Sequence, residues 1–379
     1  MNNVNLNCPK IITYFLPQYH EVPENNQWWG KGFTEWTNVK KAKTVYRGQI
    51  QPKIPLNDNY YNLLDKKTVE WQTAVSQKYG IYGFCYFYYY FKNGKKVLEK
   101  PAENLLKWKD INQRFCFFWA NVEWRRTWSS IKNQASTNWS PSDNCHTDNG
   151  LLLEQDYGDE KDWVKHFEYL IQFFKDERYI KIDGKPLFAI YYVSYIPHAY
   201  EMFKLWDSLA KKNGLPGIYI LSVNESIDNE YVNGIIHYGG GQVNRSFVYK
   251  MIDKKYRILN KISKILLKKE FPFVIDYKKY WDFILKDKPY GTVANIPGGT
   301  VKYDETPRRG PRSLCLSNDS PDIFYDCFLS QLRRASSVFN SEFLFLDAWN
   351  EWGEGNYLEP DVENGYGYLE ALKKALDDF

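Results

Sequence analysis

Short, almost continuously apolar runs recur along this chain and alternate with longer amphipathic segments. Such runs are typical of parallel strands that are buried on both faces, while the longer segments have helical spacing. Strands that alternate with helices indicate a parallel sheet, so we expect an α/β fold. The eight expected strands are 11–16, 82–90, 115–120, 187–193, 218–223, 235–238, 292–295 and 343–349.

Eight strands favour a closed (β/α)8 barrel of the TIM type over an open, doubly wound sheet. No internal repeat or low-complexity linker divides the chain. The sequence therefore predicts a single glycoside-hydrolase-like catalytic domain, 1–379, with insertions at 125–157 and 249–280, although the length also allows two domains. The five expected helices are 65–78, 161–175, 199–213, 322–336 and 366–378.

Charge and hydropathy argue against several classes of protein. The chain has 50 basic and 46 acidic residues, a balance that does not suggest nucleic-acid binding. It shows neither a signal peptide nor an apolar run of about 20 residues, the length that spans a bilayer. We therefore expect a cytoplasmic protein, although removal of a leader would leave the same sequence. The six cysteines and five histidines lack metal-ligand spacing, and we expect neither a metal nor another cofactor.

A dense cluster of glutamate, tryptophan and glycine follows the last expected strand, at 347–360. In a (β/α)8 barrel, the residues that follow the strands form the functional face. Glu351 and Glu354 lie three residues apart in this cluster. Paired carboxylates cleave glycosidic bonds, one as acid and the other as base or nucleophile, and Trp349 and Trp352 could exclude water from them. The alternative is a tryptophan-rich turn whose acids are exposed helix caps.

Polar and aromatic residues also follow the first and third expected strands, in a mixture that suits a sugar subsite. We expect Glu35, Asn121 and Glu123 to converge with the glutamate pair on one open face of the barrel. Glu123 could instead form an ion pair with Arg125 or Arg126, and His20 could be a structural histidine. The candidate substrate-binding residues are His20, Trp29, Glu35, Trp36, Trp119, Asn121, Glu123, Trp349, Asn350 and Trp352.

Four segments together resemble the WbsX family, namely YFLPQYH at 14–20, WWGKGFTEW at 28–36, FWAN at 118–121 and WNEWGEGNYLEP at 349–360. Proteins of that family occur with surface-polysaccharide loci and are commonly labelled glycosyltransferases. The family in turn resembles glycoside hydrolase family 99, retaining endo-α-mannosidases on a (β/α)8 barrel. The resemblance to WbsX spans nearly the whole chain, and the link to family 99 is strongest in N-E-W-x-E-G.

The resemblance implies separate roles for the two glutamates. Glu354 matches the general acid/base. Glu351 matches the carboxylate that deprotonates the sugar 2-hydroxyl, whose oxygen then attacks its own anomeric carbon to give a 1,2-anhydro sugar. Gly353 departs from family 99, which usually carries His at that position.

We therefore expect a retaining glycosidase or transglycosidase that acts on an α-linked oligosaccharide or polysaccharide. The alternative is a WbsX-type glycosyltransferase of O-antigen or capsule biosynthesis. Neither Asp-x-Asp nor a G-x-G-x-x-G after a strand is present, and transferases that use sugar nucleotides commonly carry such motifs. A carbohydrate-binding barrel without catalysis is a third hypothesis, and the presence of both glutamates argues against it.

Three further segments carry weaker signals. Residues 252–270 form a basic, amphipathic stretch that could make peripheral contact with an anionic membrane, or could pack on the barrel with a solvated outer face. The run 304–309, which includes Arg308 and Arg309, could supply a carboxylate and a guanidinium near the barrel mouth, where an arginine would suit an anionic sugar or a phosphate, or it could be a solvated loop. The run 297–300 has the composition of a loop that allows close approach of a ligand.

Overall fold

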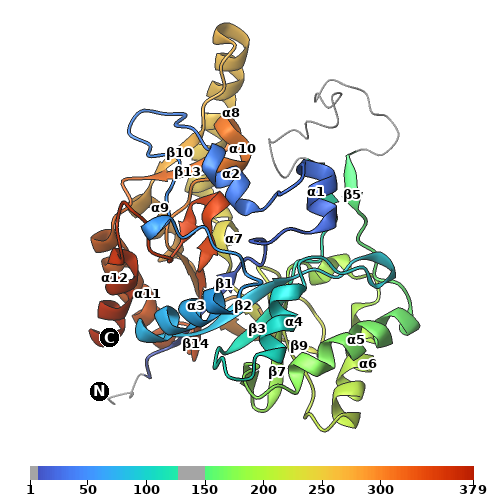
Figure 1. Cartoon of the computed structure of the whole chain (residues 1–379). Helices are drawn as coiled ribbons and strands as arrows, with labels where there is room; N and C mark the ends of the chain where they lie inside the picture. The colour runs from blue at the N-terminus through green and yellow to red at the C-terminus, as the bar shows by residue number, and fades with distance from the viewer. Residues whose placement is uncertain (1–6, 127–149) are drawn as a thin grey trace, which may run out of the picture.

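The computed structural model describes residues 7–126 and 150–379, and within these ranges nine parallel strand segments form a nearly closed barrel (Figure 1). The predicted α/β barrel is confirmed, because each expected strand overlaps one of these segments. In their order around the barrel, the segments are β11 (Ala294–Ile296), β9 (Val232–Ile236), β8 (Tyr219–Val223), β7 (Lys185–Ile190), β3 (Phe115–Trp119), β2 (Ile81–Tyr88), β1 (Lys10–Phe15), β14 (Phe343–Asp347) and β12 (Gly298–Thr300).

One position in the barrel is shared by two segments. Only Pro297 separates β11 from β12; β11 pairs with β9 on one side, and β12 pairs with β14 on the other. The nine segments thus occupy eight positions, as in a (β/α)8 barrel. The expectation of a ligand loop at 297–300 is wrong. Gly299 is buried in the wall against Trp281, where an added Cβ would lie 2.8 Å from the indole ring.

Helices flank the barrel, and the five expected ones are present with bounds within a residue or two of those predicted. Three begin where a side chain accepts a hydrogen bond from the first turn: Asp65, Asp159 and Ser320. These five are α3 (Lys66–Lys78), α5 (Glu160–Phe174), α6 (Ala199–Lys212), α11 (Pro321–Ser337) and α12 (Gly367–Asp377). The others used below are α1 (Pro23–Trp29), α2 (Glu35–Lys41), α4 (Lys100–Lys107), α8 (Phe247–Leu267), α9 (Tyr277–Ile284) and α10 (Thr306–Arg309).

The two expected insertions add elements outside the barrel. The described part of the first contains the antiparallel pair β4 (Trp124–Arg125) and β5 (Leu151–Leu153), and its remainder, 127–149, lies outside the described residues. The second contains α8 and β10 (Phe273–Asp276), which pairs in parallel with β13 (Leu314–Ser317). Figure 1 shows α8 standing out from the body of the molecule.

Aromatic side chains fill much of the barrel interior. Tyr14 of β1 contacts Phe87, Phe118 and Tyr238, at ring-centroid distances of 5.8, 5.4 and 4.8 Å. These residues come from three other strands or strand ends, so one ring layer ties together distant parts of the chain. Strands β3 and β14 are buried along their whole length, which explains their continuous apolar sequence.

Candidate active site

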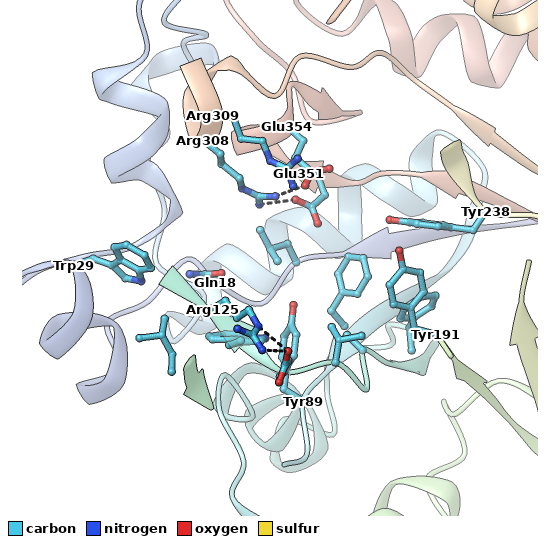
Figure 2. Close-up of a pocket in the computed structure, with 18 residues that line it drawn as sticks. Gln18, Trp29, Tyr89, Arg125, Tyr191, Tyr238, Arg308, Arg309, Glu351 and Glu354 are labelled. Atoms are coloured by element: carbon cyan, nitrogen blue, oxygen red, sulfur yellow. Dashed lines mark hydrogen bonds and ion pairs between the residues drawn. The ribbon is translucent and has the colours of Figure 1, made fainter. Parts of the chain in front are cut away.

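A cavity of about 430 Å³ lies at the carboxyl ends of the barrel strands (Figure 2). Its walls come from residues that end or directly follow five different strands: Gln18 after β1, Tyr89 after β2, Tyr191 after β7, Tyr238 after β9 and Glu351 after β14. This is the end at which barrel enzymes hold their substrates. The volume lies within the range typical of small-molecule pockets.

Aromatic rings line much of the cavity, and Glu351 and Glu354 lie together on one side of it. Trp29, Tyr89 and Tyr191 contribute to the walls. Figure 2 shows the glutamates with Arg308 on one side, while Tyr89 and Arg125 lie on the opposite side. Flat rings with polar edges suit the C–H faces and hydroxyl groups of sugars.

The centre of the acidic side is Arg308, whose guanidinium contacts three glutamates. Its Nε donates to Glu35 Oε1 at 2.9 Å, and its Nη2 donates to Glu351 Oε2 at 2.9 Å. Its Nη1 donates to Glu354 Oε1. Arg308 lies on α10 and is buried, so the expectation of a solvated loop is wrong for this residue. Its charge is directed at the protein's own carboxylates.

Burial and the neighbouring charges shift the pKa values of this cluster. Burial raises the pKa of Glu351 to about 8, against the opposing effect of Arg308 and with the support of Glu354 and Glu35. Burial also raises the pKa of Glu35, and Arg308 opposes that shift as well. For Arg308 burial acts against the charge, but Glu35, Glu354 and Glu351 outweigh it and raise the pKa well above its ordinary value. The guanidinium therefore stays charged while Glu351 can bind and release a proton near neutral pH.

Gly353, in the turn between the two glutamates, makes room for this arrangement. A Cβ added there would lie 1.5 Å from Glu35 Oε1 and 2.9 Å from Arg308 Nε. No L side chain fits at this position while Glu35 stays where it is. Position 353, where family 99 usually has histidine, is therefore a glycine in a protein whose buried Glu35 and Arg308 fill the space that a side chain would need.

Asn350 fixes the strand end that carries the pair. Its Oδ1 accepts from the Leu16 backbone N–H at 2.7 Å, and its Nδ2 donates to the Leu16 carbonyl at 3.0 Å. The Tyr19 hydroxyl donates to the Asn350 carbonyl and accepts from the Trp352 N–H. Residues 334 positions apart in the sequence are held together directly behind Glu351.

Trp352 forms part of the support beneath the turn. Its ring stacks on Tyr357 with centroids 3.6 Å apart, and its Nε1 donates to Glu359 Oε2 at 2.7 Å. Glu359 also accepts hydrogen bonds from Tyr61 and Gln72, and burial raises its pKa to about 7. These contacts orient the backbone from which Glu351 and Glu354 project.

The predicted site residues separate into those that line the cavity and those that lie behind its wall. Glu351, Glu354, Trp29 and Glu123 line it. Glu123 forms an ion pair with Arg125, with Oε1 2.6 Å from Nε, so the proposed pairing is present at the cavity edge. Glu35 reaches the cluster through Arg308.

The other predicted residues are buried and, within the described ranges, are not among those that line the cavity. Asn121 bonds to the Tyr192 backbone through Nδ2 at 2.7 Å and Oδ1 at 2.9 Å, and Trp119 donates to the Tyr90 carbonyl. Burial lowers the pKa of His20 to about 4, so its ring is neutral. We interpret the whole group as support for the wall: His20, Trp36, Trp119, Asn121, Trp349, Asn350 and Trp352.

The predicted site residues did not include further polar or aromatic residues of the wall, among them Gln18, Tyr89, Tyr191 and Tyr238. Each of these four lies within three residues of a strand end, which is the signal that could have added them to the prediction. The Gln18 Nε2 is buried and makes no hydrogen bond to the described residues. It is therefore a donor that a bound hydroxyl group could satisfy.

No group of three or more His, Cys, Asp or Glu in the described ranges has an arrangement that could hold a metal ion. The three glutamates converge on a guanidinium. The polar groups that line the cavity include the carboxyl groups of Glu351 and Glu354, tyrosine hydroxyl groups, the Gln18 amide and the buried Arg308.

Sequence comparison relates nearly all of the chain to known proteins. The profile described as "Glycosyltransferase WbsX" matches residues 11–372. Two curated relatives, each called "Uncharacterized protein WxcX" and found in two strains of Xanthomonas campestris pv. campestris, are 26% identical over 374 and 376 residues. These matches cover 97% of this chain and 49% of each relative, so the chain spans about half the length of the curated relatives it matches.

Structural comparison finds the same fold in glycoside hydrolases. A structure described as a "Glycoside hydrolase-like protein" superposes with a TM-score of 0.56 and 12% identity, covering 99% of this chain and 96% of the other. A GH99 endo-alpha-mannosidase from Bacteroides thetaiotaomicron, in complex with BIS-TRIS-propane, gives a TM-score of 0.54 and 12% identity, covering 97% and 96%. At this identity the likeness concerns the fold.

Proposed function

Because the chain belongs to the WbsX family and has the fold of GH99 enzymes, we propose that it is a carbohydrate-active enzyme that cleaves or transfers an α-linked glycan with retention of configuration. The observation that carries this proposal is the pair Glu351 and Glu354, which faces an aromatic cavity and is bridged by the buried Arg308. Two carboxyl groups in unlike environments are what an acid and a base require.

In the first step, Glu351 takes the proton of the sugar 2-hydroxyl, and that oxygen attacks the anomeric carbon. The bond from this carbon to the leaving oxygen breaks, and Glu354 gives that oxygen a proton. The product is a 1,2-anhydro sugar, with Glu351 protonated and Glu354 ionised. The raised pKa of Glu351 supports this role, since a stronger base removes a hydroxyl proton more readily.

In the second step, Glu354 takes a proton from an acceptor hydroxyl, whose oxygen attacks the anomeric carbon. The three-membered ring opens, and Glu351 returns its proton to the sugar 2-oxygen. Water as acceptor gives hydrolysis, and another sugar gives transglycosylation. Two inversions at one carbon give net retention of configuration. Arg308 keeps the charge of the cluster balanced while protons move between the two carboxyl groups and the sugar.

The second candidate function is a glycosyltransferase of surface-polysaccharide assembly, which the description of the matching family supports. Its donor would be a sugar nucleotide, with a diphosphate leaving group. Among the described arginines that line the cavity, Arg308 is the buried one, and its contacts with three glutamates favour the glycosidase over recognition of a diphosphate.

A substrate screen separates the two functions. The protein is incubated with aryl α-glycosides and α-linked polysaccharides, and separately with sugar nucleotides plus acceptor sugars. The glycosidase predicts release of the aryl group or of shortened glycans, and the transferase predicts release of nucleotide. Glu351→Gln should lower the activity found by about 10²–10⁴-fold, and Glu354→Gln should lower it most on substrates with poor leaving groups. Glu342→Gln is the matched control, because Glu342 is exposed and lies beside the first residue of β14, at the opposite end of that strand from the cavity. Sugar-nucleotide consumption without glycan cleavage would reject the proposed chemistry.

A further inference from the structure

One face of α8 packs against the protein and binds the segment that follows the helix, at Phe271. Tyr249 is buried. The Tyr256 hydroxyl donates to the Phe271 carbonyl at 2.6 Å, and Asn260 Oδ1 accepts from the Phe271 N–H at 2.9 Å. Packing on the barrel is one of two alternatives that we expect for 252–270. Packing explains the residues on this face of α8, and it leaves the other faces unexplained.

A second face of α8 is apolar and open to solvent. Phe247 is 76% exposed and Leu266 is 74% exposed, at the two ends of a stripe with helical spacing. Single apolar side chains are common on protein surfaces, but several exposed ones along one side of a helix mark an interaction surface. We call this stripe the apolar face, and it consists of Phe247, Met251, Ile258, Ile262, Ile265 and Leu266.

A third face, beside the apolar one, is basic. Its residues also recur at helical spacing, and the segment 247–270 contains eight basic and two acidic residues. The two acids are already engaged, Asp253 with Arg257 at 2.7 Å and Glu270 with Lys264 at 2.9 Å. Since the whole chain carries only 50 basic against 46 acidic residues, its excess positive charge is concentrated here. The basic face consists of Lys250, Lys254, Arg257, Lys261 and Lys264.

The position of α8 leaves both faces free for a large flat partner. Figure 1 shows the helix projecting beyond the body of the molecule, with its tip away from the barrel. None of the helices in 7–126 and 150–379 combines the length and the apolar character needed to cross a bilayer. A helix with an apolar stripe flanked by lysines is instead typical of segments that lie in the membrane interface.

We propose that α8 binds the surface of an anionic phospholipid membrane. The apolar face enters the boundary between headgroups and acyl chains, and the basic face contacts the lipid phosphates. Charge favours this occupant over a second copy of the chain, because two copies would bring two rows of lysines together, whereas anionic lipid neutralises them.

Sedimentation with vesicles tests the proposal. The whole chain is mixed with vesicles of phosphatidylcholine alone and with vesicles that also contain phosphatidylglycerol. We expect binding to the anionic vesicles, weakened by added salt, and at least about tenfold weaker binding to the neutral ones. Equal binding to both, or none to either, would overturn the proposal.

Two pairs of substitutions separate the contributions of the faces. Ile262→Ser with Ile265→Ser removes apolar area and should weaken binding at least about tenfold. Lys254→Gln with Lys261→Gln should weaken it roughly ten- to thirtyfold, since each basic residue near an anionic surface contributes about fivefold. Lys161→Gln with Lys212→Gln removes two exposed lysines from α5 and α6 and should leave vesicle binding unchanged.

Two further measurements keep the result interpretable. Circular dichroism should show that all variants are folded. Analytical ultracentrifugation should show a monomer. A dimer that the serine variant abolishes, together with no vesicle binding, would assign the apolar face to a second copy and reject the membrane. Vesicle binding needs no turnover, so its outcome is separate from that of the glycan assays.

Discussion

The carboxylate of Glu35 fills the space into which a side chain at position 353 would project. A Cβ added to Gly353 would lie 1.5 Å from Glu35 Oε1. Glu35 holds the Nε of Arg308, whose other nitrogens hold Glu351 and Glu354. The absence of a side chain at Gly353 thus lets Glu35, in the segment after the first strand, reach the cluster of Arg308, Glu351 and Glu354.

Gly353→Ala should therefore lower kcat/KM by at least about tenfold and destabilise the fold by roughly 1–3 kcal/mol, as overpacking does. The measurements are glycosidase kinetics and thermal unfolding. In a Glu35→Ala background the same substitution should cost much less, because the obstructing carboxylate is gone. If Gly353→Ala lowered kcat/KM and stability equally in both backgrounds, a clash with Glu35 would not explain why glycine is needed at position 353.

The two glutamates should respond differently to the leaving group. Glu354→Gln removes the proton donor, so the rate should fall least for aryl glycosides whose leaving groups need little protonation. Glu351→Gln removes the base that activates the 2-oxygen, so the rate should fall for good and poor leaving groups alike. General acid–base help is worth about 10²–10⁴-fold, and a series of aryl glycosides would resolve either pattern. A covalent adduct trapped on Glu351 would reject the anhydro-sugar route and retain the glycosidase.

The pH dependence of activity should follow Glu351, whose pKa burial raises to about 8. If Glu351 acts as a base, only its ionised form is active, so kcat/KM should rise with pH up to about 8 and then level until another group titrates. A kcat/KM profile recorded on the wild type measures this limb. A profile that falls from pH 6 to pH 8 would show that Glu351 must be protonated, which would exchange the roles of the two glutamates.

The same shift has a consequence for stability with a defined sign. Between the ordinary value of 4.5 and about 8, the folded state holds a proton on Glu351 that the unfolded state has released. Unfolding free energy should therefore fall as pH rises through this window. Glu351→Gln should remove this part of the slope, which is at most about 1.4 kcal/mol per pH unit for one proton. Urea unfolding at several pH values would test it, and an unchanged slope in the variant would contradict the shift.

Arg308→Met should leave three buried or partly buried carboxyl groups without their cation. We expect a loss of roughly 3–5 kcal/mol at neutral pH, the cost of breaking a buried ion pair. The loss should shrink as pH falls, because protonated carboxyl groups need no counter-charge. Arg309→Met is the matched control for stability, since Arg309 lies on the same helix but is exposed and pairs with Glu305 at 3.7 Å. If both variants lost the same unfolding free energy, the ion pairs of Arg308 with the three glutamates would not be what stabilises this part of the protein.

Local sequence pattern was sufficient to predict the barrel. The buried strands β3 and β14 are apolar along their whole length, and the helices α3 and α5 begin within one residue of the predicted bounds. Such signals depend on residues a few positions apart. The division of one barrel position at Pro297 was not predicted, since its two halves are defined by their partners β9 and β14.

For the site, the sequence by itself determined Glu351 and Glu354 as the candidate pair, because both belong to one short motif after one strand. Only the tertiary structure decided that Arg308 joins them to Glu35, which lies 273 residues away in the sequence. It also decided that Asn350 binds the Leu16 backbone and that the outer face of α8 is left exposed. The physical reason is that side-chain type and spacing specify local structure, whereas contacts between distant residues arise only when the barrel closes and fixes which loops meet.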